Sequence, residues 1–353
     1  MDAFFRDFLF WISRLLAYPF SKPQVLQLSV TYRCNLNCKM CSIAHHLDKE
    51  EELSTEQIFH VIDEAKRYGI KEILLTGGEP FLREDIYRIL KYIGDNQMFS
   101  IVTTNGTGIN RETVNKVANS GINHFHFSLD GLSDMNDYFR GEGVFEKVLD
   151  AITLLNAERS KNRSFSIGIA CTVMNKNVHQ LGDMVQLADE LKVDTINFQP
   201  LVKDNANFMD NKASDFWLDQ GSIVRLAEEI KKIRRFSPRH VRIYEEPRLE
   251  LMVDYYRGTL TQNQWRCFGG LKTVFICYSK KQPLIYSCHG ICGNLDEISL
   301  KKGWESSQAR RLRIQAKTCK NPCLQSCYSL ESAQSVSSII NRHFKKIVKS
   351  HGS

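Results

Sequence analysis

Short apolar runs alternate along most of the chain with longer segments in which apolar residues recur every three or four positions. The short runs predict β-strands, at residues 25–31, 72–76, 100–104, 124–129, 166–173 and 195–199. The longer segments predict amphipathic helices, at residues 55–68, 84–94, 111–120, 144–159, 178–191 and 222–235. Strand followed by helix, six times over, predicts an α/β fold with a parallel sheet and right-handed crossovers. This pattern fits a doubly wound sheet almost as well as a barrel, and in both the site lies at the carboxyl ends of the strands.

The first segment has a different pattern, typical of a helix with one apolar side. One half of its helical wheel collects large apolar side chains: Phe4, Phe5, Phe8, Leu9, Trp11, Ile12, Leu15, Leu16 and Tyr18. The other half holds Asp2, Arg6, Asp7, Ser13 and Arg14, with Phe10 and Ala17 as exceptions. Pro19 and Pro23 end this helix, which is too short to span a bilayer. It either lies in a membrane interface or packs on the barrel or a dimer partner. A basic, weakly amphipathic tail from Ser338 inclines the prediction towards a peripheral membrane contact.

Length and composition limit the broad class of protein. The 353 residues suit one large and one smaller domain, and a hydrophobic content of 42% suffices for a sizeable core. We expect an N-terminal helix in residues 1–24, a core domain in 25–236, a smaller domain in 237–332 and a basic tail in 333–353. The net charge of +7 has no long run of one sign, and no nucleic-acid-binding motif is present. The eleven cysteines are an odd number gathered towards both ends, which favours cytoplasmic metal chemistry over a disulfide framework.

Three cysteines, Cys34, Cys38 and Cys41, follow the first predicted strand at the spacing C-x3-C-x2-C. Thiolates on so short a loop can converge on one soft-metal centre. Three protein ligands leave one position for a substrate or cofactor, as a catalytic metal requires. A structural zinc loop with a distant fourth ligand and a set of free thiols are the alternatives.

This triplet, with the apolar Met40 before its third cysteine, resembles the signature of the radical SAM superfamily. The resemblance implies a partial (β/α)6 barrel, TIM-like and open on one side. It also implies that Cys34, Cys38 and Cys41 bind three irons of a 4Fe–4S cluster whose fourth iron is chelated by S-adenosylmethionine. Such an enzyme needs an electron donor such as flavodoxin or ferredoxin.

Three further motifs fall where the resemblance expects contacts with S-adenosylmethionine. Gly77, Gly78 and Glu79, before Pro80, resemble the family's Gly-Gly-Glu-Pro element, which hydrogen-bonds the methionine amino group of the cofactor. Asn105 ends the third strand and could line the cofactor pocket, although Asn-Gly is equally a plain turn.

Ser128 and Asp130 lie in a Ser-Leu-Asp-Gly segment at the end of the fourth strand. Period-two alternation puts them on one face, where they could reach the ribose hydroxyls or the carboxylate of the cofactor. A helix cap is the alternative for Asp130. Arg140 could pair with the cofactor carboxylate, but a surface salt bridge is the favoured interpretation.

The C-terminal region holds a second group of cysteines: Cys267, Cys277, Cys288, Cys292, Cys319, Cys323 and Cys327. Their order around a predicted hairpin resembles the SPASM and twitch extensions of radical SAM enzymes, small cysteine-rich α+β domains that hold auxiliary iron–sulfur clusters. The resemblance assigns Cys267 and Cys288 to the first two ligand positions and Cys319, Cys323 and Cys327 to the others. The late C-x3-C-x3-C spacing departs from the full two-cluster pattern, so one auxiliary 4Fe–4S cluster is predicted, with a zinc site as the alternative.

The predicted activity is reductive cleavage of S-adenosylmethionine to a 5′-deoxyadenosyl radical that abstracts hydrogen from a substrate, with net oxidation or crosslinking. The substrate class stays open between a peptide, a small metabolite such as a sugar or aminocyclitol, and a lipid-linked molecule. A non-catalytic iron–sulfur or zinc scaffold is the distant alternative, disfavoured by the intact motifs around Glu79 and Ser128.

Overall fold

The computed structural model describes residues 3–41, 43, 52–161, 164–202, 215–288, 290–320 and 323–335. Its strands are β1 (Val25–Thr31), β2 (Glu72–Gly77), β3 (Phe99–Thr104), β4 (His124–Ser128), β5 (Ser166–Val173), β6 (Thr195–Pro200), β7 (Arg242–Tyr244), β8 (Thr273–Ser279), β9 (Gln282–Ser287) and β10 (Gly290–Asn294). Its α-helices are α1 (Ala3–Leu16), α3 (Thr55–Tyr68), α4 (Ile86–Asp95), α5 (Val114–Ala118), α6 (Ser133–Arg140), α7 (Val144–Arg159), α8 (Leu181–Glu190), α9 (Gln220–Arg235), α10 (Leu251–Arg257), α11 (Leu300–Trp304) and α12 (Ser307–Lys317). Short 3-10 helices are η1 (Pro80–Leu82), η2 (Val178–Gln180), η4 (Ser326–Tyr328) and η5 (Glu331–Ala333).

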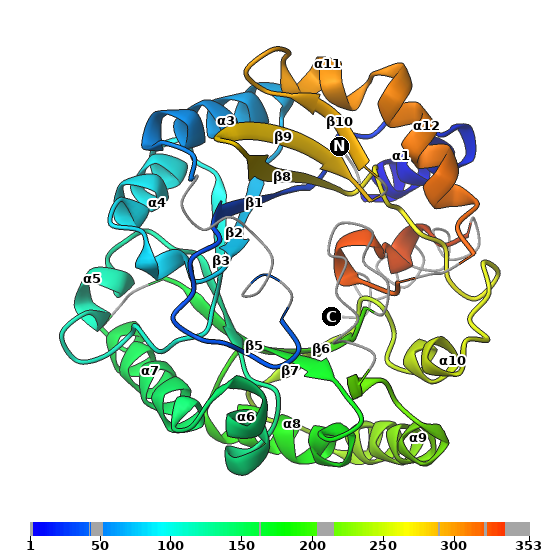
Figure 1. Cartoon of the computed structure of the whole chain (residues 1–353). Helices are drawn as coiled ribbons and strands as arrows, with labels where there is room; N and C mark the ends of the chain where they lie inside the picture. Colours follow the sequence, from blue (N-terminus) through cyan, green and yellow to red (C-terminus); the bar gives the residue numbers. More distant parts are fainter. Residues whose placement is uncertain are drawn as a thin grey trace, which may run out of the picture.

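All ten strands belong to one sheet in the order β10-β9-β8-β1-β2-β3-β4-β5-β6-β7. Strands β1 to β7 follow the chain order and pair in parallel, as a barrel requires; a doubly wound sheet would reverse its order. Figure 1 shows the sheet curving round with helices α3 to α9 on its outer side, and with η4 and η5 between its two edges. The predicted partial barrel is therefore confirmed.

The C-terminal strands extend the same sheet. Strand β8 pairs in parallel with β1, with Val25 opposite Thr273 and Leu28 opposite Ile276. β9 and β10 then continue from β8 as antiparallel neighbours. Strand β7, at the start of the region expected to form the smaller domain, forms the other edge of the sheet. Residues 237–332 thus share the sheet of residues 25–236.

Strand β4 illustrates how the sequence alternation produces two faces. Phe125 and Phe127 are fully buried in the main hydrophobic core, whereas His124, His126 and Ser128 are half-buried on the opposite face. Burying each phenylalanine contributes about 1.5–3 kcal/mol to folding.

The predicted helices are present: α3 and α7 have the predicted bounds, and α4 and α9 differ from them by one or two residues at their ends. The helix predicted for residues 178–191 is divided into η2 and α8, and that for residues 111–120 shortens to α5. The shortening has a local cause: the Thr113 hydroxyl accepts a hydrogen bond from the Asn110 amide at 2.9 Å and donates one to the Gly108 carbonyl at 2.8 Å. Such side-chain bonds compete with the first helical turn. Helices α6 and α10 and strand β7 were not predicted.

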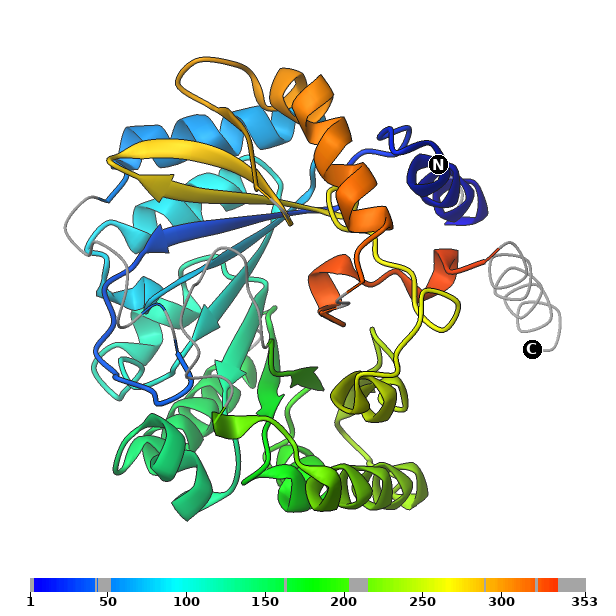
Figure 2. The ribbon, with the colours of Figure 1, turned by 45° about the vertical axis from the view of Figure 1, so that its right-hand side comes forward.

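Helix α1 packs on the C-terminal segment through an unexpected face. Phe10 is fully buried against Phe268, Leu271, Leu330 and Ala333. The residues of α1 and its end that are buried are Asp7, Phe10, Ser13 and Ala17. Phe10 and Ala17, the two exceptions on the polar half of the helical wheel, are therefore the apolar residues by which the helix attaches. In Figure 2, α1 lies at the end of the sheet where the strands begin, opposite the loop that follows β1.

None of the described helices is long and apolar enough to cross a membrane. Of the basic tail predicted for residues 333–353, the part from residue 336 onward lies outside the described residues.

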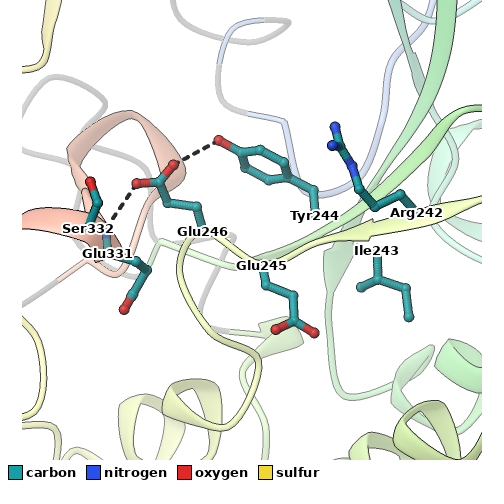
Figure 3. Close-up of a pocket in the computed structure, with 7 residues that line it drawn as sticks. All are labelled: Arg242, Ile243, Tyr244, Glu245, Glu246, Glu331 and Ser332. Atoms are coloured by element: carbon teal, nitrogen blue, oxygen red, sulfur yellow. Dashed lines mark hydrogen bonds between the residues drawn. The ribbon is translucent and has the colours of Figure 1, made fainter. Parts of the chain in front are cut away.

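A cavity of about 460 Å³ lies between β7 and η5, at the gap between the two edges of the sheet. Figure 3 shows its wall, in which the Tyr244 hydroxyl donates to Glu246 at 3.0 Å and the Glu331 amide donates to the other Glu246 oxygen at 3.0 Å. The remaining lining residues are Arg242, Ile243, Glu245 and Ser332.

Candidate active site

The three cysteines of the first motif lie on the loop that follows β1. Two backbone bonds hold this loop: the Lys39 amide donates to the Phe139 carbonyl at 2.9 Å, and the Cys41 amide donates to the Cys38 carbonyl at 3.1 Å. Burial, together with the neighbouring thiols of Cys41 and Cys34, raises the pKa of the Cys38 thiol to about 11. Burial likewise raises the pKa of Cys34. A metal that binds these cysteines must therefore displace the protons of their thiols.

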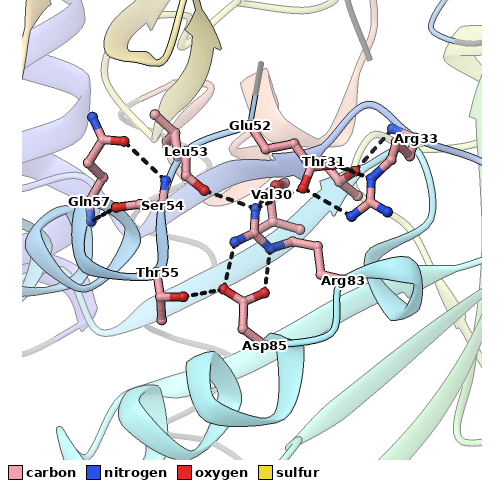
Figure 4. A network of polar contacts seen from close by, with 10 residues as sticks. All are labelled: Val30, Thr31, Arg33, Glu52, Leu53, Ser54, Thr55, Gln57, Arg83 and Asp85. Atoms are coloured by element: carbon pink, nitrogen blue, oxygen red, sulfur yellow. Dashed lines mark hydrogen bonds and ion pairs between the residues drawn. The ribbon is translucent and has the colours of Figure 1, made fainter. Parts of the chain in front are cut away.

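A buried arginine supports the start of this loop. Arg83 donates from Nη1 to the carbonyls of Val30 at 2.8 Å and Leu53 at 3.1 Å, and from Nη2 to Asp85 at 2.6 Å. Figure 4 shows the guanidinium joining the end of β1 to the segment before α3, with Glu52 bridging towards the cysteine loop. No local pattern marks Arg83 beyond its position after Pro80, and its role depends on the fold.

The Gly-Gly-Glu turn after β2 lies directly on the backbone that leads to the cysteines. The Gly78 amide donates to the Thr31 carbonyl at 2.7 Å, and the Glu79 amide donates to the Arg33 carbonyl at 2.8 Å. A Cβ atom on Gly77 would overlap the Thr31 carbonyl oxygen, and one on Gly78 would overlap that of Arg33. Both glycines are required because two backbones meet here.

Glu79 is a fully enclosed carboxylate, with 1% of its surface exposed. One oxygen accepts from the Thr104 hydroxyl at 2.8 Å and the Phe81 amide at 3.2 Å, and the other accepts from the Asn105 amide at 2.7 Å. Burial raises its pKa to about 7, against the lowering effect of these hydrogen bonds. A nearby ammonium would favour the ionised form and strengthen binding.

Asn105 connects this carboxylate with the cysteine loop. Its side-chain amide donates to the Asn35 side chain at 2.8 Å and lies 3.9 Å from the Cys34 sulfur. Its oxygen accepts from the Thr107 amide at 2.9 Å, as in an Asx turn. Asn105 therefore forms a turn and also approaches the site.

Ser128 ends β4 on the half-buried face, but Asp130 lies beyond the strand and is fully buried. The Asp130 carboxylate accepts from Arg140 at 2.8 and 2.6 Å and from the Thr172 amide at 2.7 Å. The interpretation of Arg140 as a surface ion pair is wrong, because its side chain is 12% exposed and its partner 0%. Burial lowers the pKa of Arg140, but the Asp130 carboxylate favours the charged guanidinium and the net effect is a raised pKa. Asp130 thus orients a cation beside the cysteine loop.

The structure brings together five cysteines of the second group: Cys267, Cys288, Cys319, Cys323 and Cys327. Burial raises the pKa of the Cys267 and Cys323 thiols, and it raises that of Cys288 to about 11 and that of Cys327 to about 12. Gly269 permits the approach, since a Cβ atom there would lie 3.2 Å from the Cys267 sulfur and 3.3 Å from the Cys288 Cβ.

The other cysteines lie elsewhere. Cys277 faces the Ser29 hydroxyl at 3.8 Å, Cys292 is beside Arg313, and Cys171 is buried in the core. All eleven cysteines are free thiols, so no disulfide framework is present among them.

Two cations that the sequence did not single out face the five-cysteine group. Buried Lys272 donates to the carbonyls of Ser326 at 2.9 Å and Ser329 at 2.6 Å, and pairs with Glu246 of the cavity wall at 3.5 Å. Arg14 of α1 donates to the Cys267 carbonyl at 3.0 Å and to Gln262 at 2.9 Å. Gln262 in turn donates to the Cys319 carbonyl at 3.0 Å. No local pattern marks these residues, because only the fold brings them to the cysteines.

The donor sets fit iron–sulfur clusters. Across the described residues, no three His, Cys, Asp or Glu side chains stand ready to hold a single metal ion. Both groups offer thiols only, the ligand type that iron–sulfur clusters use. The Cys34, Cys38 and Cys41 loop also has a buried carboxylate and an oriented guanidinium beside it, which suit a ligand carrying an amino and a carboxylate group.

Comparison with known proteins places these features in context. The sequence profile of the Radical SAM superfamily matches residues 28–188. Fe-coproporphyrin III synthase of Methanosarcina barkeri is 33% identical over 192 residues, 54% of this chain and 47% of that enzyme. The chain thus spans about half the length of that relative.

Two relatives match over longer stretches. An AdoMet-dependent heme synthase of Oleidesulfovibrio alaskensis is 30% identical over 310 residues, 81% of this chain and 75% of that enzyme. PqqA peptide cyclase of Bradyrhizobium diazoefficiens is 26% identical over 328 residues, 88% of this chain and 80% of the other. Among solved structures, Streptococcus suis SuiB bound to S-adenosylmethionine shares the fold at a TM-score of 0.66 and 17% identity, over 90% of this chain and 78% of that chain.

Proposed function

Because the chain belongs to the radical SAM superfamily, we propose that it cleaves S-adenosylmethionine reductively at a cluster held by Cys34, Cys38 and Cys41. When bound, a 4Fe–4S cluster and S-adenosylmethionine supply a 5′-deoxyadenosyl radical that abstracts hydrogen from a substrate carbon. The observation that carries the proposal is the double backbone contact between the Gly-Gly-Glu turn and the cysteine loop. It fixes the buried Glu79 carboxylate beside the thiols, an arrangement for which a structural metal loop has no use.

The residues around the loop divide the binding task by charge. Glu79 holds the amino group of the cofactor, since it is the enclosed carboxylate nearest the loop. Arg140, held by Asp130, provides a cation for the cofactor carboxylate. Asn105 and Ser128 provide neutral polar groups on the same side of the sheet. Gly77 and Gly78 keep the two loops in contact.

In this proposal the five C-terminal cysteines form the set from which one auxiliary 4Fe–4S cluster takes its ligands, one cysteine for each iron. Lys272 offsets the negative charge of the thiolates from within the protein. A cluster here could accept an electron from a substrate radical, which would make the net reaction an oxidation or a crosslink. A donor such as flavodoxin or ferredoxin supplies the first electron, and a cytoplasmic location keeps the eleven thiols reduced. The peripheral membrane contact expected for the N-terminal helix does not depend on this chemistry.

The substrate class proposed first is a peptide. PqqA peptide cyclase is similar over 88% of the chain, and the fold is that of SuiB, which has also been solved bound to its precursor peptide SuiA. A tetrapyrrole is the second candidate, favoured by the higher identity to AdoMet-dependent heme synthase over 81% of the chain. A small metabolite or a lipid-linked molecule has no comparable support.

The ligand assignment is tested by anaerobic reconstitution followed by iron, sulfide and 5′-deoxyadenosine analysis. The wild-type protein should hold two 4Fe–4S clusters and form 5′-deoxyadenosine with dithionite. Replacing Cys34, Cys38 and Cys41 together by Ala should leave one cluster and no cleavage. Cys277→Ala is the matched control, because that thiol faces Ser29 and lies outside both proposed ligand sets, and the variant should retain both clusters. Wild-type iron in the triple variant would show that the ligands are wrongly assigned.

The substrate class is tested by isotope transfer. The enzyme is incubated with candidate precursor peptides or with Fe-coproporphyrin III, each deuterated at the carbon under test. The substrate should increase the formation of 5′-deoxyadenosine and transfer deuterium to it. Transfer from the tetrapyrrole and from none of the peptides would overturn the peptide proposal while leaving the cofactor chemistry in place.

A further inference from the structure

Helix α1 attaches to the protein through its more polar side and turns its apolar side outward. Half of the exposed large apolar side chains in the described part of the chain fall within residues 4–20: Phe4, Phe5, Leu15, Leu16, Tyr18 and Phe20. Phe5 and Leu16 have 52% and 50% of their surface exposed, although both belong to the apolar half of the helical wheel. A helix that served only to cover the core would bury this half.

Positive charge gathers beside this apolar surface. Helix α12 lies next to α1, and the Lys317 ammonium donates to the Leu15 carbonyl at 2.8 Å. No acidic residue occurs in α12, whose exposed positions include Arg310, Arg311 and the apolar Ile314. Apolar and basic side chains therefore share one face of the molecule.

The distribution of charge along the sequence is uneven, with the positive excess in the part of the chain that begins with α12. Residues 306–353 contain nine Lys or Arg and a single acidic residue, Glu331, a net charge of +8. The whole chain carries +7, so the first 305 residues together carry −1. The described chain leaves η5 beside α1, where Ala333 packs on Phe10, and the last eighteen residues include four Lys or Arg and no acid. The net positive charge of the protein thus lies in residues 306–353, whose described part includes α12 and η5.

We propose that the apolar side of α1, together with the basic face of α12, docks on an anionic lipid surface. The aromatic and aliphatic side chains of α1 would enter the headgroup region, and the basic residues would face anionic headgroups. A second copy of this chain would bring like charges together, which disfavours it as the occupant. Because α1 lies at the end of the sheet opposite the cysteine loop, docking leaves that loop free (Figure 2).

The test is flotation of the anaerobically reconstituted full-length protein with two kinds of vesicle. One kind consists of phosphatidylcholine alone, and the other contains about one third phosphatidylserine, whose negative charge attracts basic residues. Wild-type protein should bind the anionic vesicles at least tenfold more strongly. Phe5→Ser with Leu16→Ser should lower this binding about tenfold or more. Val224→Ser is the matched control, since Val224 is 56% exposed on α9, away from this face, and should bind as wild type does.

A second pair of variants separates the contribution of charge. Arg310→Gln with Arg311→Gln should remove most of the preference for phosphatidylserine and leave the thermal unfolding midpoint unchanged. Equal binding by the wild type and the Phe5, Leu16 double variant would overturn the proposal. A wild-type dimer in sedimentation velocity that the Phe5, Leu16 double variant does not form would also overturn it, because the face would then bind a second copy. Vesicle binding that appears only after residues 336–353 are deleted would overturn it as well, because the face would then be covered by the tail.

Discussion

Replacing Asp130 separates two roles that its carboxylate could have. Asp130 is fully buried and makes three hydrogen bonds of 2.6–2.8 Å, two of them with Arg140. Asp130→Asn leaves the Arg140 cation buried without its counter-ion, which costs about 3–5 kcal/mol. If unfolding entropy is about 2.1 cal/mol/K per residue, a loss of about 4 kcal/mol lowers the melting temperature by ~5 °C for a chain of this size. The measurement is urea and thermal unfolding of the protein without S-adenosylmethionine.

A double-mutant cycle tests the cause. Arg140→Met removes the cation and keeps most of the side-chain volume, so the Asp130→Asn, Arg140→Met double variant should be no less stable than Asp130→Asn alone. The two effects would add if the residues acted independently. Additive losses of stability in the double variant would refute this reasoning. So would an Asp130→Asn protein that has wild-type stability but binds S-adenosylmethionine tenfold more weakly, which would indicate direct contact between Asp130 and the cofactor.

Three other substitutions test the surroundings of the two cysteine groups. Gly78→Ala should displace the cysteine loop and reduce its iron loading. Gly94→Ala, in a helix with open space around it, is the control and should retain full loading. Equal iron contents in the two variants would contradict the role given to the contact between Gly78 and the Arg33 carbonyl. Burial raises the pKa of Glu79 from 4.5 to about 7. Between these two values the folded state keeps a proton that the unfolded state releases, so the stability of the folded state falls as the pH rises. The urea midpoint should therefore drop between pH 5 and 7 in the wild type and not in Glu79→Gln. Arg14→Gln should speed the loss of auxiliary-cluster iron to a chelator several-fold relative to the surface control Arg225→Gln on α9, and equal rates would rule out support by Arg14.

The elements that the sequence predicted are those whose pattern is local. Strand β1 has the predicted bounds, and β4 shows the expected alternation, because a strand with one buried face repeats every two residues. The convergence of the five C-terminal cysteines was expected only from the resemblance to the SPASM and twitch extensions, because β10, α11 and α12 separate the hairpin from the last three cysteines.

Other features depend on contacts between distant segments and leave no local trace. The side by which α1 attaches could not be predicted, because a helical wheel identifies the apolar half of a helix but not the surface against which the helix packs. Asp7 and Ser13 could be buried only because hydrogen bonds compensate them, as when the Ser13 hydroxyl donates to the Leu9 carbonyl. The burial of Arg140 and the role of Lys272 were missed for the same reason: their buried partners lie on other segments of the chain.

The pairing of β8 with β1 also sets the order in which the protein can be completed. Val25 is paired with Thr273, 248 positions later in the chain. At a synthesis rate of about 5–20 residues per second, that strand emerges roughly 12–50 s after the first. Until then, β1 has β2 on one side and an unpaired edge on the other, the kind of surface that recruits strands from other chains. The nascent polypeptide must keep this edge protected for tens of seconds, and the first strand to be made is among the last to be enclosed.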